Sequence, residues 1–247
     1  MSTPRGSAGP GLADAYLIEE LAALPGLVHG FSSLRLGAME RRGDERVLIP
    51  SRAALLRELG LEDRAGDLTT LAAVHGSDLA EVGERRGAIP RVDGLVTDRP
   101  GIPLLATFGD CCPLVLYDPR RHALALCHAG WRGTALGIAG RAVAALRERY
   151  GSEPEDLVCG IGPSICGDCY EVGPEVAARF DGAGCRPGPG GSPLLDVGEV
   201  NRLQLVAAGV PTDSVHRHPA CTRETPDLPS HRRDHDGRRF AAVAALR

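Results

Sequence analysis

The sequence predicts a protein of the mixed α/β class (α+β), because apolar runs of strand length alternate with segments of helical apolar period. The strongest strand signal is a pair of apolar runs of strand length within 109–133, joined by a short turn at 119–121 as in a β-hairpin. The strongest helix signal is 134–150, where one broad face is apolar and a glycine follows. Together these signals indicate a chain with both sheet and helix in its core.

Weaker signals cover the rest of the chain. Pro50–Ser51 is predicted to cap a helix over 52–59. Two further helices are predicted, over 170–180 and from Asp196 to Gly209, and the Gly- and Pro-rich segment between them, 183–193, is expected to be a mobile loop. Further apolar runs of strand length are 68–74, its returning neighbour 79–82, and then 92–97, 102–107, 157–161 and 240–246.

Composition narrows the class of protein. The chain has 247 residues, of which 43% are hydrophobic and 24% charged, as in an ordinary soluble enzyme. Its formal net charge of -4 argues against nucleic acid or a membrane surface as a partner. All 28 basic residues are arginine, so lysine chemistry such as a Schiff base is excluded.

The ends and the cysteines set expectations about organisation. Residues 1–12 are expected to form a disordered tail, and 13–247 a single catalytic domain. The start of the chain lacks the apolar core of a secretory signal, so a cytoplasmic location is expected. In that compartment the eight cysteines are expected to be free thiols or metal ligands rather than disulfides.

Thiols and an imidazole gather at one end of the predicted hairpin. Cys111 and Cys112 stand at the start of its first run, and Cys127 and His128 at the end of its second. In an antiparallel pair the start of one strand lies beside the end of the other, so these groups should converge. His75, followed by a glycine at another predicted strand end, is a further candidate for the same rim.

Two chemistries fit such a cluster. A catalytic zinc takes three protein ligands and keeps one position open, and His75, Cys111 and His128 are suitable donors. Alternatively, Cys111 is a nucleophile activated by His128, which implies acyl transfer or deamidation. Residue composition does not separate these two hypotheses, because both need a thiol and an imidazole close together.

Two other features point to binding. The turn that contains Arg132 precedes the predicted helix 134–150, and a helix start beside an arginine favours a phosphate or carboxylate. Cys166 and Cys169 form a Cys-x-x-Cys pair, which is a weak signal for redox chemistry or for half of a zinc site. A second Cys-x-x-Cys pair that would complete such a site is absent from the sequence.

Five sequence blocks occur together in one order, and they are specific as a set. They are Val74–Gly76, Gly109–Pro113, His128–Gly133, Ile161–Ile165 with Cys169–Gly173, and Ser230–Asp234. With them the chain resembles the purine nucleoside phosphorylase family that was earlier named multicopper polyphenol oxidase, or laccase domain. The resemblance covers roughly residue 28 to residue 247.

The resemblance implies a fold and a metal. The implied fold is a single domain of layered mixed sheets flanked by helices, similar to a cysteine-hydrolase-like α-β-β-α arrangement. The implied metal is zinc, held by His75, Cys111 and His128, with copper less favoured because the chain lacks the histidine-rich ligand sets of multicopper sites.

The resemblance also implies an activity. It implies phosphorolysis of adenosine, inosine, guanosine or methylthioadenosine, and deamination of adenosine, so the expected partners are purine nucleosides and phosphate. Arg132, Arg232 and Arg35 are the candidates for anchoring phosphate or substrate, and Asp110 for orienting a ligand or moving a proton. Arg35 is displaced by one position from the family pattern. A monomer or homodimer is expected.

Other functions stay open at this stage. One is a Cys111/His128 hydrolase or deamidase, and another is a copper-dependent polyphenol oxidase. The third is an interaction protein whose zinc is structural, which a fourth protein ligand such as Cys112 or Cys127 would indicate.

Overall fold

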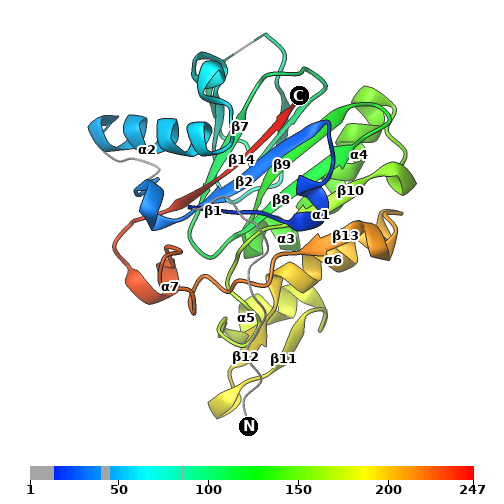
Figure 1. Ribbon diagram of the computed structural model, residues 1–247. Coiled ribbons are helices and arrows are strands. Elements are labelled where there is room, and N and C mark those ends of the chain that lie inside the picture. The colour runs from blue at the N-terminus through cyan, green and yellow to red at the C-terminus, as the bar shows by residue number, and fades with distance from the viewer. Residues whose placement is uncertain (1–13, 40–44, 85) are drawn as a thin grey trace.

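The computed structural model describes residues 14–39, 45–84 and 86–247. Their strands form two six-stranded mixed sheets (Figure 1). In spatial order the first sheet contains β1 (Ala15–Tyr16), β2 (Leu27–Ser32), β14 (Phe240–Leu246), β7 (Leu104–Phe108), β3 (Thr69–Ala72) and β5 (Gly87–Pro90). The second contains β13 (Val215–Arg217), β10 (Val158–Ile161), β8 (Cys112–Asp118), β9 (Ala123–Ala129), β6 (Gly94–Thr97) and β4 (Leu79–Glu81).

The two sheets pack face to face between helices. Side chains of β7 and β14 share one buried cluster with side chains of β8 and β9, which is the contact between the sheets. The outer face of the second sheet packs on α4 (Ile138–Tyr150) and α6 (Val197–Ala207), and α2 (Glu45–Glu58) covers the outer face of the first. The expected α-β-β-α layering is therefore confirmed. The remaining α-helices are short: α1 (Glu19–Ala22), α3 (Trp131–Ala135), α5 (Pro174–Ala177) and α7 (His231–Asp234).

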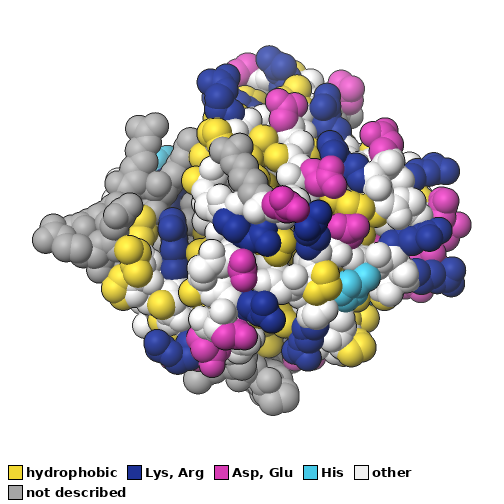
Figure 2. Space-filling view, turned by 90° about the horizontal axis from the view of Figure 1, so that it is seen from above, with side chains coloured by type: hydrophobic (Ala, Val, Ile, Leu, Met, Phe, Trp, Pro, Cys, Tyr) yellow, Lys and Arg dark blue, Asp and Glu magenta, His cyan; other side chains and the backbone are white. Residues whose placement is uncertain are grey.

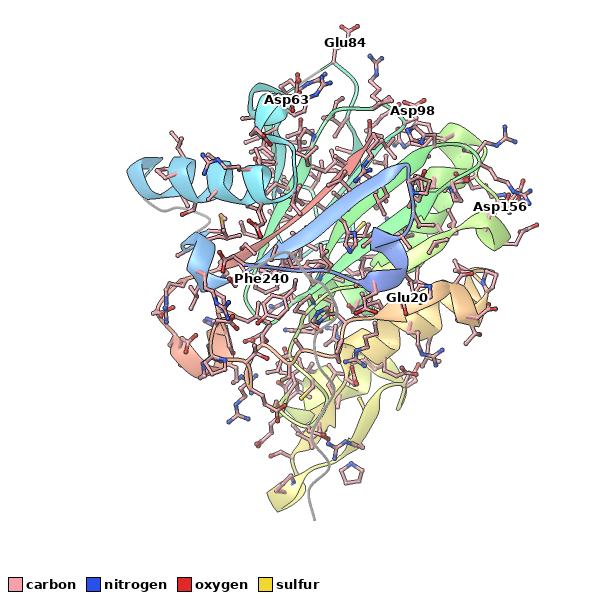
Figure 3. The ribbon with its side chains drawn as sticks, in the orientation of Figure 1. Glu20, Asp63, Glu84, Asp98, Asp156 and Phe240 are labelled. Atoms are coloured by element: carbon pink, nitrogen blue, oxygen red, sulfur yellow. The ribbon has the colours of Figure 1, made fainter. Side chains whose placement is uncertain are left out.

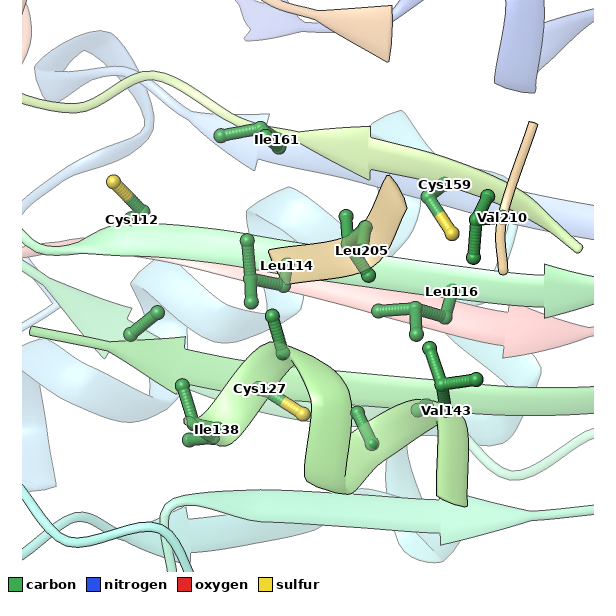
Figure 4. Packing of buried hydrophobic residues seen from close by; sticks show 14 of the residues in the cluster. Cys112, Leu114, Leu116, Cys127, Ile138, Val143, Cys159, Ile161, Leu205 and Val210 are labelled. Atoms are coloured by element: carbon green, nitrogen blue, oxygen red, sulfur yellow. The ribbon is translucent and has the colours of Figure 1, made fainter. Parts of the chain in front are cut away.

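The predicted hairpin is confirmed and lies in the middle of the second sheet. β8 and β9 are antiparallel, with Cys112 opposite Ala129 and Pro113 opposite His128. Both strands are buried along their whole length, which explains why each reads as an unbroken apolar run. Alternate residues of β8, such as Leu114 and Leu116, face α4 (Figure 4).

Three predicted elements differ from the structure. α2 begins at Glu45 and contains Pro50, because Leu48 ahead of the proline is also buried and extends the packing face. The predicted helix 134–150 is split into α3 and α4 at Gly137, whose φ of 77° lies in the left-handed region. The segment 79–82 does not return beside 68–74, because β4 pairs with β6 in the other sheet.

Two further predictions were wrong between residues 170 and 195. The predicted helix 170–180 is helical only from Pro174, since the chain before it pairs at Glu171 with Leu194. The predicted mobile loop contains β11 (Cys185–Pro187) and leads into β12 (Pro193–Leu195), which form a small antiparallel pair. Buried Leu194 and Leu195 anchor this pair, a tertiary effect that glycine and proline content does not reveal.

The surface carries charges of both signs. On the face shown in Figure 2, basic and acidic side chains are interspersed rather than gathered into a region of one sign. Among the described residues, no helix is long and apolar enough to cross a membrane.

Candidate metal centre and active site

The structure brings His75, Cys111 and His128 together. One ligand atom from each lies within 4.8 Å of the others. His75 follows β3 where the chain crosses from the first sheet to the second, Cys111 immediately precedes β8, and His128 is near the end of β9. The site therefore lies at the strand ends where the two sheets meet.

Asp93 contacts the segments that carry both histidines, and the sequence patterns did not single it out. Its buried carboxylate accepts backbone N–H bonds from Val74 (3.1 Å), His75 (2.9 Å) and Gly76 (2.7 Å), and Nδ1 of His128 lies 3.1 Å away. Burial alone would raise the pKa of Asp93, but the bonds from His128 and from the backbone outweigh it and lower the pKa. An ionised Asp93 therefore accepts a hydrogen bond from the Nδ1–H of His128. This bond directs Nε2, the other ring nitrogen, toward metal binding.

The hydrogen bonds that Asp93 accepts also explain the backbone conformation at His75. Its φ of 60° is unusual for a residue with a side chain, and three N–H bonds to one carboxylate hold the turn in that conformation. The rings of His75 and His128 meet edge to face, with centroids 5.0 Å apart. His128 also packs against Phe108, which stacks on Phe240. Phe240, at the start of β14, is labelled in Figure 3.

Cys111 and His128 influence each other's protonation. Burial alone would raise the pKa of the Cys111 thiol, but the positive charges and hydrogen bonds of His128 and His75 lower it below its ordinary value. The pKa of His128 is raised in turn, because the thiolate and Asp93 outweigh its burial. Thiolate is the form of cysteine that binds metals and the form that acts as a nucleophile.

Two glycines make room for this group. A Cβ on Gly130 would lie 3.0 Å from Sγ of Cys111 and 3.2 Å from Cδ2 of His75. A Cβ on Gly133 would lie 2.5 Å from the carbonyl oxygen of Gly76, so α3 approaches the His75 turn only because residue 133 is glycine. The space that a larger residue would fill is therefore left beside the three candidate ligands.

Cys112 and Cys127 do not complete the group. Both are fully buried in the cluster that faces α4, on the opposite side of the sheet from the strand-end site. Burial raises the pKa of each to about 12, which keeps them as neutral thiols. Within the described residues, the group thus offers three donors, so a tetrahedral metal bound here would keep its fourth position for a non-protein ligand.

Asp110 connects the site to the C-terminal segment. Its Oδ1 accepts the hydroxyl of Thr222 at 2.6 Å, and its Oδ2 accepts the backbone N–H of Arg232 at 2.6 Å. Its φ of 83° is again unusual for a residue with a side chain. These bonds orient Asp110 beside Cys111, and Thr222 is a partner that the sequence did not single out.

Two of the predicted anchor arginines lie beside aromatic rings. The guanidinium of Arg132, near the start of α3, lies 4.3 Å from the ring centroid of Trp131. The guanidinium of Arg232 lies 5.0 Å from the ring of Tyr170 and donates to the carbonyl of Glu171 at 2.8 Å. Both side chains belong to exposed residues, so their charges are accessible to an anion.

Arg35, the third predicted anchor, has acidic partners. Its guanidinium lies 3.6 Å from Asp14 and 3.4 Å from Asp227. Because two carboxylates share its charge, Arg35 is less suited than Arg132 to bind a phosphate.

Two layered mixed sheets with a His/Cys/His group at their strand ends define an α/β protein with a candidate three-ligand metal centre. Residues 27–247 match the family model described as multi-copper polyphenol oxidoreductase laccase, and the chain belongs to this family. The resemblance read from the five sequence blocks is thereby confirmed.

Named relatives in this family are similar over much of the chain. Purine nucleoside phosphorylase YlmD of Geobacillus stearothermophilus is 40% identical over 183 residues, an alignment that covers 65% of each chain. A crystal structure of YlmD from that organism covers 91% of this chain and 93% of its own, with a TM-score of 0.84 and 31% identity.

Two other relatives are named for different reactions, one for phosphorolysis and one for deamination. Purine nucleoside phosphorylase ORF3 of Streptomyces griseus is 36% identical over 87% of this chain and 88% of its own. Adenosine deaminase RL5, from an unidentified prokaryote, is 34% identical over 73% of this chain and 74% of its own. The family therefore includes proteins named for two reactions of purine nucleosides.

Proposed function

We propose that the protein is a zinc-dependent purine nucleoside phosphorylase acting on adenosine, inosine or guanosine. The observation that carries the proposal is the three-donor group of His75, Cys111 and His128, in a family whose relatives are named for this reaction. In the reaction the C1′–N9 bond breaks, a phosphate oxygen bonds to C1′, and the departing base takes a proton. The products are the free base and ribose 1-phosphate.

Zinc suits these donors better than copper does. One thiolate and two neutral imidazoles are good zinc ligands, whereas multicopper chemistry calls for more histidines than this group supplies. Zinc bound here would supply Lewis-acid chemistry at the edge of the sheets. Asp93 would keep His128 in the tautomer that binds metal, and Gly130 would keep the adjacent space open.

The charged residues around the group have separate roles in the proposal. Arg132, exposed beside Trp131, would anchor the phosphate, and Arg232 would do so from the opposite segment. Both carboxylate oxygens of Asp110 already accept hydrogen bonds, so Asp110 would position Cys111 and the Arg232 backbone rather than carry a proton. Arg35 remains the weakest candidate because of its acidic partners.

Deamination of adenosine is the second candidate activity, favoured by the relative named adenosine deaminase. In that reaction water replaces the exocyclic amine at C6, which gives inosine and ammonia, and a metal centre with a free position suits it. Methylthioadenosine is a further candidate substrate for phosphorolysis. A hydrolase in which Cys111 is the nucleophile and His128 its base also fits the geometry, and the variants described below separate it from metal catalysis.

The test is to incubate purified protein of known metal content with adenosine or inosine, with and without phosphate, and to separate the products by chromatography. We expect adenine from adenosine and hypoxanthine from inosine only when phosphate is present. Inosine formed from adenosine without phosphate would demonstrate deamination. Absence of adenine and hypoxanthine from every reaction, with no inosine formed from adenosine, would overturn the proposed function.

A further inference from the structure

A second group of metal-binding side chains lies outside the proposed active site. It consists of Cys166, Cys169, Cys221 and Glu224, and one ligand atom from each lies within 4.8 Å of the others. Cys166 and Cys169 follow β10, whereas Cys221 and Glu224 follow β13. The Cys-x-x-Cys pair of Cys166 and Cys169 therefore lies beside a Cys-x-x-Glu pair, Cys221 and Glu224, which is distant in the sequence.

The two pairs lie on turns of the same construction. The backbone N–H of Cys169 donates to the carbonyl of Cys166 at 3.0 Å, and that of Glu224 donates to the carbonyl of Cys221 at 3.1 Å. A β-bridge between Ser164 and Cys221 holds the turns side by side. Each turn therefore presents its first and fourth side chains toward the other.

Contacts within the group resemble those around a bound metal. The backbone N–H of Cys166 points at Sγ of Cys221, 3.3 Å away, which is the kind of donor that a thiolate ligand accepts. Sγ of Cys169 lies 3.6 Å from Oε1 of Glu224. Tetrahedral zinc with Zn–S bonds of about 2.3 Å sets its sulfurs about 3.8 Å apart, so only a small contraction is needed.

Hydrogen bonds from Arg233 hold the turn that carries Cys221. Nη1 of Arg233 donates to the carbonyls of Thr222 (2.8 Å), Arg223 (3.0 Å) and Thr225 (3.2 Å). A turn whose carbonyls are satisfied in this way keeps its geometry whether or not a ligand is bound.

We propose that Cys166, Cys169, Cys221 and Glu224 bind a second zinc ion, which is structural. Three thiolates and a carboxylate fill all four positions of tetrahedral zinc and leave none for a substrate. Binding displaces the thiol protons to solvent and requires no oxidant. The site also braces the proposed active site, since Thr222, next to Cys221, holds Asp110, next to Cys111.

The test is metal analysis of protein purified under reducing conditions without chelators and dialysed against buffer with zinc. We expect two zinc ions per wild-type chain and one in both Cys169→Ser and Glu224→Gln. Cys185→Ser is the matched control, because Cys185 is a partly exposed thiol that belongs to neither group, and it should retain both. Cys111→Ala should retain the zinc of this second group.

Cobalt substitution gives a readout that is independent of activity. In Cys111→Ala loaded with cobalt, we expect strong thiolate-to-cobalt absorption, which Cys169→Ser should weaken. A single zinc per wild-type chain that Cys111→Ala abolishes and Cys169→Ser leaves in place would overturn the proposal. A disulfide between Cys166 and Cys169 in the zinc-treated wild type, detected by mass spectrometry, would overturn it as well.

Discussion

The two groups of metal-binding side chains are built in opposite ways. His75, Cys111 and His128 come from the ends of three strands in both sheets, whereas the second group comes from two adjacent turns. The first has three donors and is backed by buried Asp93, and the second has four donors and is backed by Arg233. An incomplete set on rigid strands leaves a position for a substrate, and a complete set on turns joins two segments of chain.

The largest effect should follow from removing Cys111. We expect Cys111→Ala to lose zinc from the strand-end group and to lower kcat/KM for phosphorolysis more than about 100-fold, beyond the range for losing a supporting hydrogen bond. Cys112→Ala is the control, because that thiol faces α4 and should keep zinc and activity. Loss of activity with that zinc still bound would instead identify Cys111 as a nucleophile.

Substitution of Asp93 should have the next largest effect, and it should weaken zinc binding only at the group of His75, Cys111 and His128. Asp93→Asn replaces one acceptor oxygen by an amide, so it should weaken zinc binding there about 10- to 100-fold, as titration with a competing chelator would measure. Asp98→Asn is the matched control, since Asp98 is exposed and lies well apart from Phe240, in the upper part of the view in Figure 3. Equal zinc affinity in Asp93→Asn and wild type would show that the hydrogen bond to His128 does not support the metal.

Chelator should separate the two groups in time. Because the strand-end group has a free position and one ligand fewer, limiting chelator should remove its zinc first. Phosphorolysis should therefore be lost before the melting temperature falls. The melting temperature should fall only when the second zinc is released. Simultaneous loss of activity and thermal stability would mean that the two groups do not differ in this way.

A smaller effect should reveal how the groups communicate. Thr222→Val removes the hydroxyl bonded to Asp110 but keeps the side-chain shape, so we expect kcat/KM to fall several-fold with both zinc ions retained. Thr225→Val is a suitable control, because Thr225 is on the same segment and its contact with Arg233 uses only its backbone carbonyl. Unchanged kinetics in Thr222→Val would show that the second group does not brace the first.

The smallest effect is expected from substitution of His29, which belongs to neither metal-binding group and should change only the pH dependence of stability. Burial and the nearby His218 lower the pKa of His29 to about 4, so the folded protein keeps it neutral. As pH falls from 6.5 to about 4 the unfolded chain takes up a proton first, and stability present above pH 6.5 is lost across that window. His29→Gln should reduce this acid-dependent loss in denaturant melts, with zinc content at pH 7.5 unchanged; an identical pH profile would contradict the assignment.

The sequence predicted the part of the site that depends on local pairing. Cys111 and His128 converge because a hairpin brings the start of β8 to the end of β9, and that follows from two apolar runs and a turn. His75 joins them through a crossover between sheets, which residue patterns alone did not establish. Asp93 was missed because its four partners come from two distant segments and become visible only when β6 and β9 pair.

The same reasoning explains the other misses. Cys221 and Glu224 were not connected to the Cys166 turn, because one member of the second pair is a glutamate and the pairing is long-range. Gly137 divides a segment with an unbroken apolar period, since a glycine inside a helical pattern does not by itself show a left-handed conformation. Tertiary contacts decided each of these points.

The proposed second zinc site lies where Ser164 and Cys221 form a β-bridge, and it has a consequence for the chain between these two residues. Segment 170–220 contains β11, β12 and α6, and β11 and β12 project beyond the main sheets (Figure 1). A metal that joins the two ends of this segment acts as a removable cross-link and lowers the entropy of the unfolded chain, by the equivalent of about 4 kcal/mol for a disulfide closing such a loop. The projecting part would then open as one cooperative unit when zinc is withdrawn, and would stay closed, with slow amide exchange, while zinc is bound.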